Sequence, residues 1–236
     1  MNNMNNQISN SNRLHIAIII AAAIISVGWI MKGEQTDQIV GLGKGSSALD
    51  ISTEVTIVDG GHILPIEMEE MMAKELVEIG VIDPTKLPEA TELNLLWAFG
   101  LANKNQVLTE GPMMDKKYGG PENMASVGGW TVSHGHTMGH YAMHNLLELD
   151  PKQQVLLEKV SKNIFRPCCR NSTYFPDCNH GMAMLALLEI LAYQGATEDE
   201  MNLAARKANG IWFPGTSGGG DFRSSQTLQN PPYQCS

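Results

Sequence analysis

A strongly apolar stretch in the C-terminal half of the chain reads Asn179-His-Gly-Met-Ala-Met-Leu-Ala-Leu-Leu-Glu-Ile-Leu-Ala-Tyr193. It is predicted to form a helix that Asp177 or Asn179 caps, because both side chains can accept a hydrogen bond from the first N–H groups of a helix. Helical spacing of apolar residues also covers residues 66–79 and 89–102. These segments together predict a mainly α domain.

Capping signals predict two further helices on either side of this stretch. Asp150-Pro-Lys-Gln153 has the residue order that opens a helix, and that helix must end before Pro167. Thr197-Glu-Asp-Glu200 is a capping box for a last helix that reaches Lys207. Residues 54–58 alternate in a way that suits one short strand. The expected fold class is therefore mainly α, with at most one short strand or hairpin.

The N-terminal part of the chain carries an export segment. Eighteen nearly unbroken apolar residues run from Leu14 to Met31. At ~1.5 Å per residue they would reach about 27 Å as a helix, enough to cross the hydrocarbon core of a bilayer. The alternative is a cleaved signal peptide that ends near the small residues Ser26 and Gly28. We expect an uncleaved anchor, because the apolar run continues past that site.

Composition divides the chain into segments of different character. These are a polar tail (1–13), a transmembrane signal anchor (14–31), a flexible tether (32–52), an extracytoplasmic helical domain (53–214) and a loose tail (215–236). The domain is expected to be membrane-anchored, or secreted if the N-terminal segment is cleaved. A formal net charge of −9 without a basic patch argues against nucleic acid as a partner. The membrane, bound through residues 14–31, is the partner that the sequence indicates.

Four of the seven histidines fall within eleven residues, at His134, His136, His140 and His144. Residues 133–149 are predicted to be helical, so that His136, His140 and His144 would share one helix face. Met143 on the same side is a candidate soft ligand. Neutral imidazole binds zinc, copper and nickel, and two histidines one turn apart can share an ion. The segment is therefore a candidate metal site.

A second group of candidate ligands follows at Cys168, Cys169, Cys178 and His180. A disulfide from Cys168 or Cys169 to Cys178 would suit an exported chain, and closing a loop of about ten residues would stabilise the fold by somewhat under ~3 kcal/mol. Metal ligation is the alternative, because Cys178 precedes a predicted helix whose dipole favours thiolate. Inert thiols are the third interpretation. Met184 is a candidate soft ligand, although core packing is the commoner role of methionine.

Three of the four cysteines and five of the seven histidines lie within 47 residues, which favours one metal site built from both groups. We expect a transition-metal-binding domain for sequestration or electron transfer. Copper is the first choice because His, Cys and Met coexist in an exported chain, and zinc is close behind. A haem- or metal-dependent oxidoreductase is the enzymatic alternative, and haem would then be held non-covalently by His or by His/Met axial ligation. The structural alternative is a disulfide-stapled surface domain without a ligand.

The predicted anchor can be tested by placing charges near its centre. Replacing Ile19→Arg together with Ile24→Asp is expected to release the chain from membranes or to block its export, because two such charges cost several kcal/mol together. Membrane recovery after alkaline extraction measures the effect, with an Ile19→Leu, Ile24→Leu variant as the control. Equal recovery of the two variants would show that this segment does not anchor the chain.

Overall fold

A computed structural model describes residues 62–130 and 132–214 of the chain, all within the unit Ile57–Ser236. The described residues are mainly helical and form no sheet, which confirms the predicted mainly α fold at this level. The polar tail, anchor, tether, short strand and C-terminal tail predicted above lie outside the described residues. Among the helices that are described, none has both the length and the apolar character needed to cross a bilayer.

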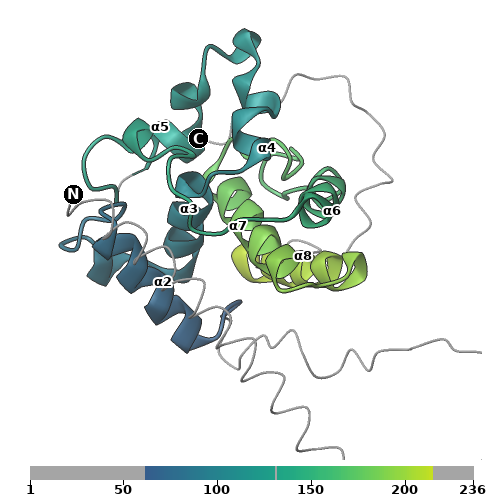
Figure 1. Cartoon of the computed structure of the whole chain (residues 1–236), viewed down its shortest axis with the longest axis horizontal. Coiled ribbons are helices and arrows are strands. Elements are labelled where there is room, and N and C mark those ends of the chain that lie inside the picture. Colours follow the sequence, from purple (N-terminus) through teal and green to yellow (C-terminus); the bar gives the residue numbers. More distant parts are fainter. Residues whose placement is uncertain (1–61, 131, 215–236) are drawn as a thin grey trace, which may run out of the picture. The chain divides into compact units, whose positions relative to one another are not determined.

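Short 3-10 turns lie among the α-helices in the first part of the described chain, and the last three helices follow one another without such a turn (Figure 1). The α-helices are α2 (Ile66–Glu78), α3 (Glu92–Ala102), α4 (Gln106–Thr109), α5 (Ala125–Gly128), α6 (Pro151–Ser161), α7 (Asn179–Tyr193) and α8 (Glu198–Trp212). The 3-10 turns are η1 (Leu87–Glu89), η2 (Pro112–Met114), η3 (Lys116–Tyr118), η4 (Pro121–Asn123) and η5 (Thr137–Gly139).

Helix α7, the apolar stretch of the sequence, forms the centre of the core. It packs against α3, α6 and α8, and it runs between α3 and α6 in Figure 1. Every residue of α7 from Gly181 to Ile190 is buried, and α3 is buried from Leu95 to Ala102. Helices that are apolar on all faces need this kind of complete burial. Helices α2, α5, α6 and α8 each pack against one or both of these two helices.

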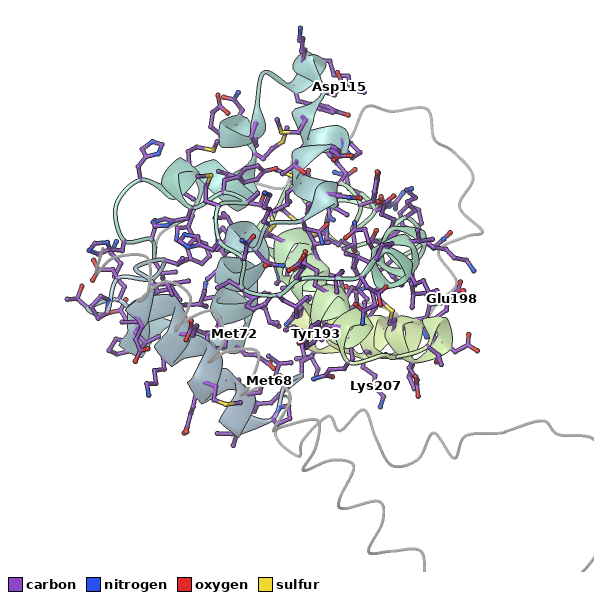
Figure 2. All side chains as sticks on the ribbon, viewed as in Figure 1. Met68, Met72, Asp115, Tyr193, Glu198 and Lys207 are labelled. Carbon is purple, nitrogen blue, oxygen red and sulfur yellow. The ribbon has the colours of Figure 1, made fainter. Side chains whose placement is uncertain are left out.

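The contact between α3 and α7 depends on a glycine. A methyl group added at Gly100 would collide with the main-chain oxygen of Met182 and lie 3.2 Å from the Cβ atom of Ala186. The two backbones therefore approach more closely than any residue larger than glycine would allow at this position. Helix α2 then covers α3 with a face that buries Met68 and Met72, one turn apart on the ribbon in Figure 2, together with Leu76.

Side-chain caps begin α6 and α8 as predicted. The Asp150 carboxylate accepts from the N–H groups of Lys152 and Gln153 at 2.7 and 2.9 Å. Thr197 and Glu200 form the predicted capping box of α8. Helix α8 continues to Trp212 rather than ending at Lys207, because its last turns pack against the rest of the domain and bury Ala208 and Asn209.

The predicted caps of α7 are wrong. Cys178 occupies the N-cap position and makes no capping hydrogen bond through its side chain. The Asp177 carboxylate binds Arg166 and Asn171 instead. Asn179 is already the first helical residue, and its side chain pairs with His180.

The predicted helix over residues 133–149 is also wrong. Within it the chain makes only the 3-10 turn η5, and isolated bridges pair Ser133 with Ile82 and His144 with Asn103. Gly135 and Ala142 have φ angles of 78° and 52°, in the left-handed region that an α-helix excludes. The histidines therefore lie on a loop rather than along one helix face.

A carboxyl group is buried in the middle of α7. Glu189 is completely buried, and its Oε2 atom accepts a hydrogen bond of 3.1 Å from Nδ2 of Asn103 at the end of α3. The Oδ1 atom of Asn103 in turn accepts from the N–H groups of Leu146 and Leu147. Burial raises the pKa of Glu189 from 4.5 to about 8, against the opposing effect of the Asn103 hydrogen bond. Glu189 is thus protonated at neutral pH and links α7 to α3 and to the loop before α6.

Glu189 makes the stability of the domain depend on pH. The folded chain keeps this proton up to about pH 8, whereas the unfolded chain releases it near 4.5. Its stabilising effect is therefore complete below about pH 4.5 and is lost progressively as the pH rises from there to about 8, by at most about 1.4 kcal/mol per pH unit. In Glu189→Gln this dependence should disappear. The free energy of unfolding of the variant, relative to that of the wild type, should therefore increase as the pH rises. Urea unfolding at several pH values measures the difference. The exposed Glu148→Gln variant should track the wild type, and a Glu189→Gln difference that is constant with pH would contradict the assignment.

Candidate metal centre

The cysteine loop, residues 165–178, joins α6 to α7 and reverses the direction of the chain. Phe165 and Ser172 pair as an antiparallel bridge near the base of the reversal. Cys168 and Cys169 lie between them, at the turn, and the rest of the loop leads back to the first turn of α7. Two cysteines that are eleven and ten residues before α7 in sequence are in this way brought to its N-terminus.

Two overlapping groups of potential metal ligands meet at that end of α7. The sulfur atoms of Cys168 and Cys178 and a ring nitrogen of His180 lie within 4.8 Å of one another. The sulfur atoms of Cys169 and Cys178 and a carboxylate oxygen of Asp177 satisfy the same limit. Cys178 belongs to both groups and is therefore their centre.

The spacing of these atoms is close to that of a tetrahedral site. Ligand atoms that lie ~2.0–2.3 Å from one zinc ion are about 3.3–3.8 Å apart. The limit of 4.8 Å on the separations here is about 1 Å or more above these values, so side-chain rotation would have to bring the atoms closer together. Cys169 and Cys178 are buried, His180 is half-buried and Cys168 is exposed. Cys168 therefore lies where an ion from solvent would first meet the group.

Arg166 is fully buried beneath the cysteine loop and binds it at several points. Its Nε atom donates to the sulfur of Cys169 at 3.4 Å, and its Nη atoms donate to the main-chain oxygens of Ser172 and Phe175 at 2.9 and 3.0 Å. A second bond from Nη2 reaches the carboxylate of Asp177. A buried guanidinium with all these partners fixes the conformation of the loop.

The charge of Arg166 acts on the sulfur atoms around it. Burial disfavours this charge, but the neighbouring Cys178, Cys169 and Asp177 outweigh burial and raise the pKa of the guanidinium. The adjacent sulfurs of Cys168 and Cys169, followed by burial, raise the pKa of the Cys178 thiol. Arg166 opposes that rise. It is thus a fixed positive charge beside the atoms that a metal ion would need as thiolates.

Both carboxylate oxygens of Asp177 bind side chains of the cysteine loop. One oxygen binds Arg166, and the other accepts a bond of 2.9 Å from Nδ2 of Asn171. Burial raises the pKa of Asp177 to about 6, and the attraction of Arg166 limits that rise. Because both oxygens already have partners, Asp177 orients the groups around the sulfurs and is a weaker candidate for a ligand than the cysteines.

The hydrogen bond of His180 leaves one of its ring nitrogens with a lone pair that can bind a metal ion. Its Nδ1 atom lies 3.0 Å from Oδ1 of Asn179, which can only accept, so Nδ1 carries the proton and Nε2 keeps its lone pair. Burial and the charge of Arg166 lower the pKa of this imidazole. Its ring packs against Phe213 and Trp212 at centroid distances of 4.5 and 6.0 Å. The end of α8 therefore covers one side of the site.

The structure brings Cys168, Cys169, Cys178 and His180 to the start of α7, where each belongs to a group that contains Cys178. The four histidines between residues 134 and 144 are not part of these groups. Within the described residues, no group of three or more ligating side chains includes His134, His136, His140 or His144. His134 and His136 are exposed, whereas His140 and His144 are half-buried and stack on each other. The two candidate soft ligands also differ, since Met143 is 68% exposed and Met184 is fully buried.

The structure joins none of Cys168, Cys169 and Cys178 in a disulfide. The staple from Cys178 to Cys168 or Cys169 therefore stays a prediction, as does metal ligation by the same sulfurs. The two would exclude each other, because a sulfur in a disulfide is not available as a thiolate ligand.

Sequence reasoning did not find a third group, formed by His62, Glu69 and Glu92. Nδ1 of His62 lies 2.7 Å from Glu69, and Glu92 accepts from the N–H groups of Ile63 and Leu64. Glu92 thereby ties the chain before α2 to the start of α3. No spacing in the sequence signals this group, since its members come from three separate segments.

No protein family, curated protein or solved structure matches this chain.

The position of Arg166 can be tested through Gly181 on α7. A methyl group added at Gly181 would lie 2.5 Å from Nη1 and 2.7 Å from Cζ of Arg166. Because Arg166 is enclosed and bonded on all sides, Gly181→Ala is expected to destabilise the domain by about 1–3 kcal/mol. Urea unfolding followed by circular dichroism measures the change.

Gly210→Ala in α8 is the matched control, because nothing lies within 4 Å of the methyl group it adds. Alanine is the better helix former, so this variant should be neutral or more stable by about 0.5–1 kcal/mol. Equal stability of the Gly181 and Gly210 variants would contradict the close packing of Arg166 on α7.

Proposed function

We propose that this domain binds one transition-metal ion through Cys168, Cys169, Cys178 and His180, and that its function is to sequester that ion. The observation that carries the proposal is the shared position of Cys178, whose sulfur lies within 4.8 Å of ligand atoms from both groups at the start of α7. Three sulfurs and one imidazole form a donor set that zinc takes in closed, four-coordinate sites.

The donor set favours zinc over the copper that composition alone suggests. Electron-transfer copper sites typically combine two imidazoles with one thiolate and a long axial contact. Here sulfur predominates, and the histidines that would supply further imidazoles lie on a different loop. Cu⁺ remains the second choice because thiolates also suit it. With all four positions filled by protein, the site has none open for a substrate, which favours storage over catalysis.

The surroundings support a bound thiolate–metal group. Three thiolates and one Zn²⁺ together carry a single negative charge, and the buried Arg166 lies directly beside them, with a 3.4 Å bond to Cys169. Asn179 fixes the tautomer of His180, as outer partners of metal-bound histidines commonly do. In this proposal the described residues would supply both the ligands and the groups that orient them.

We further propose that residues 14–31 tether this domain to the extracytoplasmic face of a membrane. The support is the length and apolar composition of that segment. The compartment outside the cytoplasm is oxidising and favours a disulfide between these cysteines. An experiment must therefore distinguish the disulfide staple from metal binding.

Metal analysis of the full chain, purified without a histidine tag and without reductant, tests the proposal. We expect about one zinc ion per chain, and ligation by Cys178 and His180 predicts that Cys178→Ser and His180→Ala each lose it. Bound metal also stabilises the folded state, so Zn²⁺ at about 100 times its Kd should raise the unfolding free energy of the wild type by about 2.7 kcal/mol.

Cys235→Ser and His134→Ala are matched controls, because each removes the same kind of donor from elsewhere in the chain. Both should keep the metal and the stabilisation. Mass mapping after rapid alkylation distinguishes metal binding from the disulfide staple. A disulfide at Cys178 in protein isolated without reductant would support the staple and contradict the metal centre. Retention of full metal content by Cys178→Ser would overturn the proposal.

A further inference from the structure

The loop that carries His140 and His144 is fixed to the C-terminal end of α3. The N–H groups of Ala142 and His144 donate to the main-chain oxygens of Leu101 and Ala102 at 2.8 and 2.9 Å. The N–H of Lys104 donates to the oxygen of His144 at 2.8 Å. These main-chain bonds hold the two histidines in place independently of the contacts that their rings make.

The ring of His140 has a defined protonation pattern. Its Nε2 atom lies 2.7 Å from the main-chain oxygen of His134, which can only accept, so Nε2 carries the proton. In the neutral ring Nδ1 then has the lone pair. That atom faces Nε2 of His144 at 3.3 Å, and the two rings stack with centroids 5.5 Å apart. A separation of 3.3 Å is slightly longer than the usual range of a nitrogen-donated hydrogen bond, about 2.7–3.2 Å, so a hydrogen bond between the two rings is a weak one.

The same separation fits two nitrogens on one metal ion. Two imidazole nitrogens that each lie ~2.05 Å from a zinc ion at a tetrahedral angle are about 3.3 Å apart. The geometry points to a second metal site, in which Nδ1 of His140 and Nε2 of His144 bind one Zn²⁺ ion. This site shares no ligand with the cysteine loop and does not depend on the function proposed for that loop.

The setting of the pair supports a cation. The oxygens of Leu101 and Ala102 belong to the last turn of α3, and the C-terminal end of a helix is the negative end of its dipole. Ala142, between the two histidines, has a φ of 52°, a conformation that costs energy for a residue with a side chain. The loop therefore holds the two rings together at the expense of local strain, which is a feature of preorganised binding sites.

The pair would bind an ion that exchanges. Both histidines are only half-buried, and they supply two of the four positions that zinc fills. Water or a donor from another molecule would complete the coordination. The cysteine loop offers four protein ligands, so the two sites would differ in how readily they release the ion.

Titration of the full chain with Zn²⁺ by calorimetry tests this inference, with Co²⁺ as a spectroscopic substitute. Sulfur-to-cobalt charge transfer reports the cysteine loop, and only an ion bound without that signal belongs to the histidine pair. We expect such an ion in the wild type. His140→Ala and His144→Ala should each weaken its binding roughly tenfold or more, because each removes half of a chelate. The charge-transfer signal should stay unchanged in both variants.

A double variant, His134→Ala with His136→Ala, is the matched control. It removes two exposed histidines of the same loop and keeps the main-chain oxygen that binds His140. This control should bind the second ion as the wild type does. Conservative His140→Gln and His144→Gln variants, checked by circular dichroism, separate loss of ligation from loss of fold, and they too should lose the second ion.

Two results would overturn the inference. One is unchanged binding of the thiolate-independent ion in His140→Ala and His144→Ala, which would leave the pair a hydrogen-bonded contact. The other is loss of that ion in the His134, His136 control, which would move the site to the exposed histidines. Failure of the metal centre at the cysteine loop would instead remove the charge-transfer signal and leave the second ion in place.

Discussion

The close contact between α3 and α7 is the constraint on which the other described elements depend. Gly100 lets the backbone of α3 rest on the Met182 oxygen and on Ala186, where any side chain would force the helices apart. Both helices are buried around their whole circumference at this contact. Their separation therefore sets the space left for α2, α6 and α8. The same contact fixes α7 along its length, and so determines where its first turn presents Cys178 and His180.

Burial of one charge organises the cysteine loop. A guanidinium without water must find its partners within the protein, and Arg166 finds them in two main-chain oxygens, the Asp177 carboxylate and the sulfur of Cys169. Gly181 provides the space for it on the surface of α7. The hydrogen bonds that Arg166 makes also determine the conformation of the cysteine loop. The position of the buried charge and the positions of the sulfur atoms are therefore linked.

The two proposed sites are built in different ways from the same scaffold. At the start of α7, cysteines from a folded-back loop gather around a helix end, with Trp212 and Phe213 of α8 covering His180. At the end of α3, main-chain hydrogen bonds pin a loop whose histidines remain partly in solvent. The first arrangement favours a retained ion and the second an exchanging one. Both place a potential ligand group at a helix terminus, where the backbone leaves a partial charge.

The sequence by itself determined the five longer helices, α2, α3, α6, α7 and α8, because apolar spacing and capping residues act locally. The boxes of Asp150 with Gln153 and of Thr197 with Glu200 begin α6 and α8 where the residue types require it. Four candidate ligands, Cys168, Cys169, Cys178 and His180, could likewise be named from their sequence clustering.

The tertiary structure decided which local tendencies were overruled and which ligands meet. The histidine-rich segment has helical spacing, yet its bonds to the end of α3 and the left-handed Gly135 and Ala142 make it a loop. Aspartate commonly caps helices, but the carboxylate of Asp177 binds the buried guanidinium of Arg166 instead. Spacing along the chain carries no information about such partners. They come from elements that only packing brings together, and the cost of leaving a buried charge or a backbone group without a partner exceeds the small preferences of single residues.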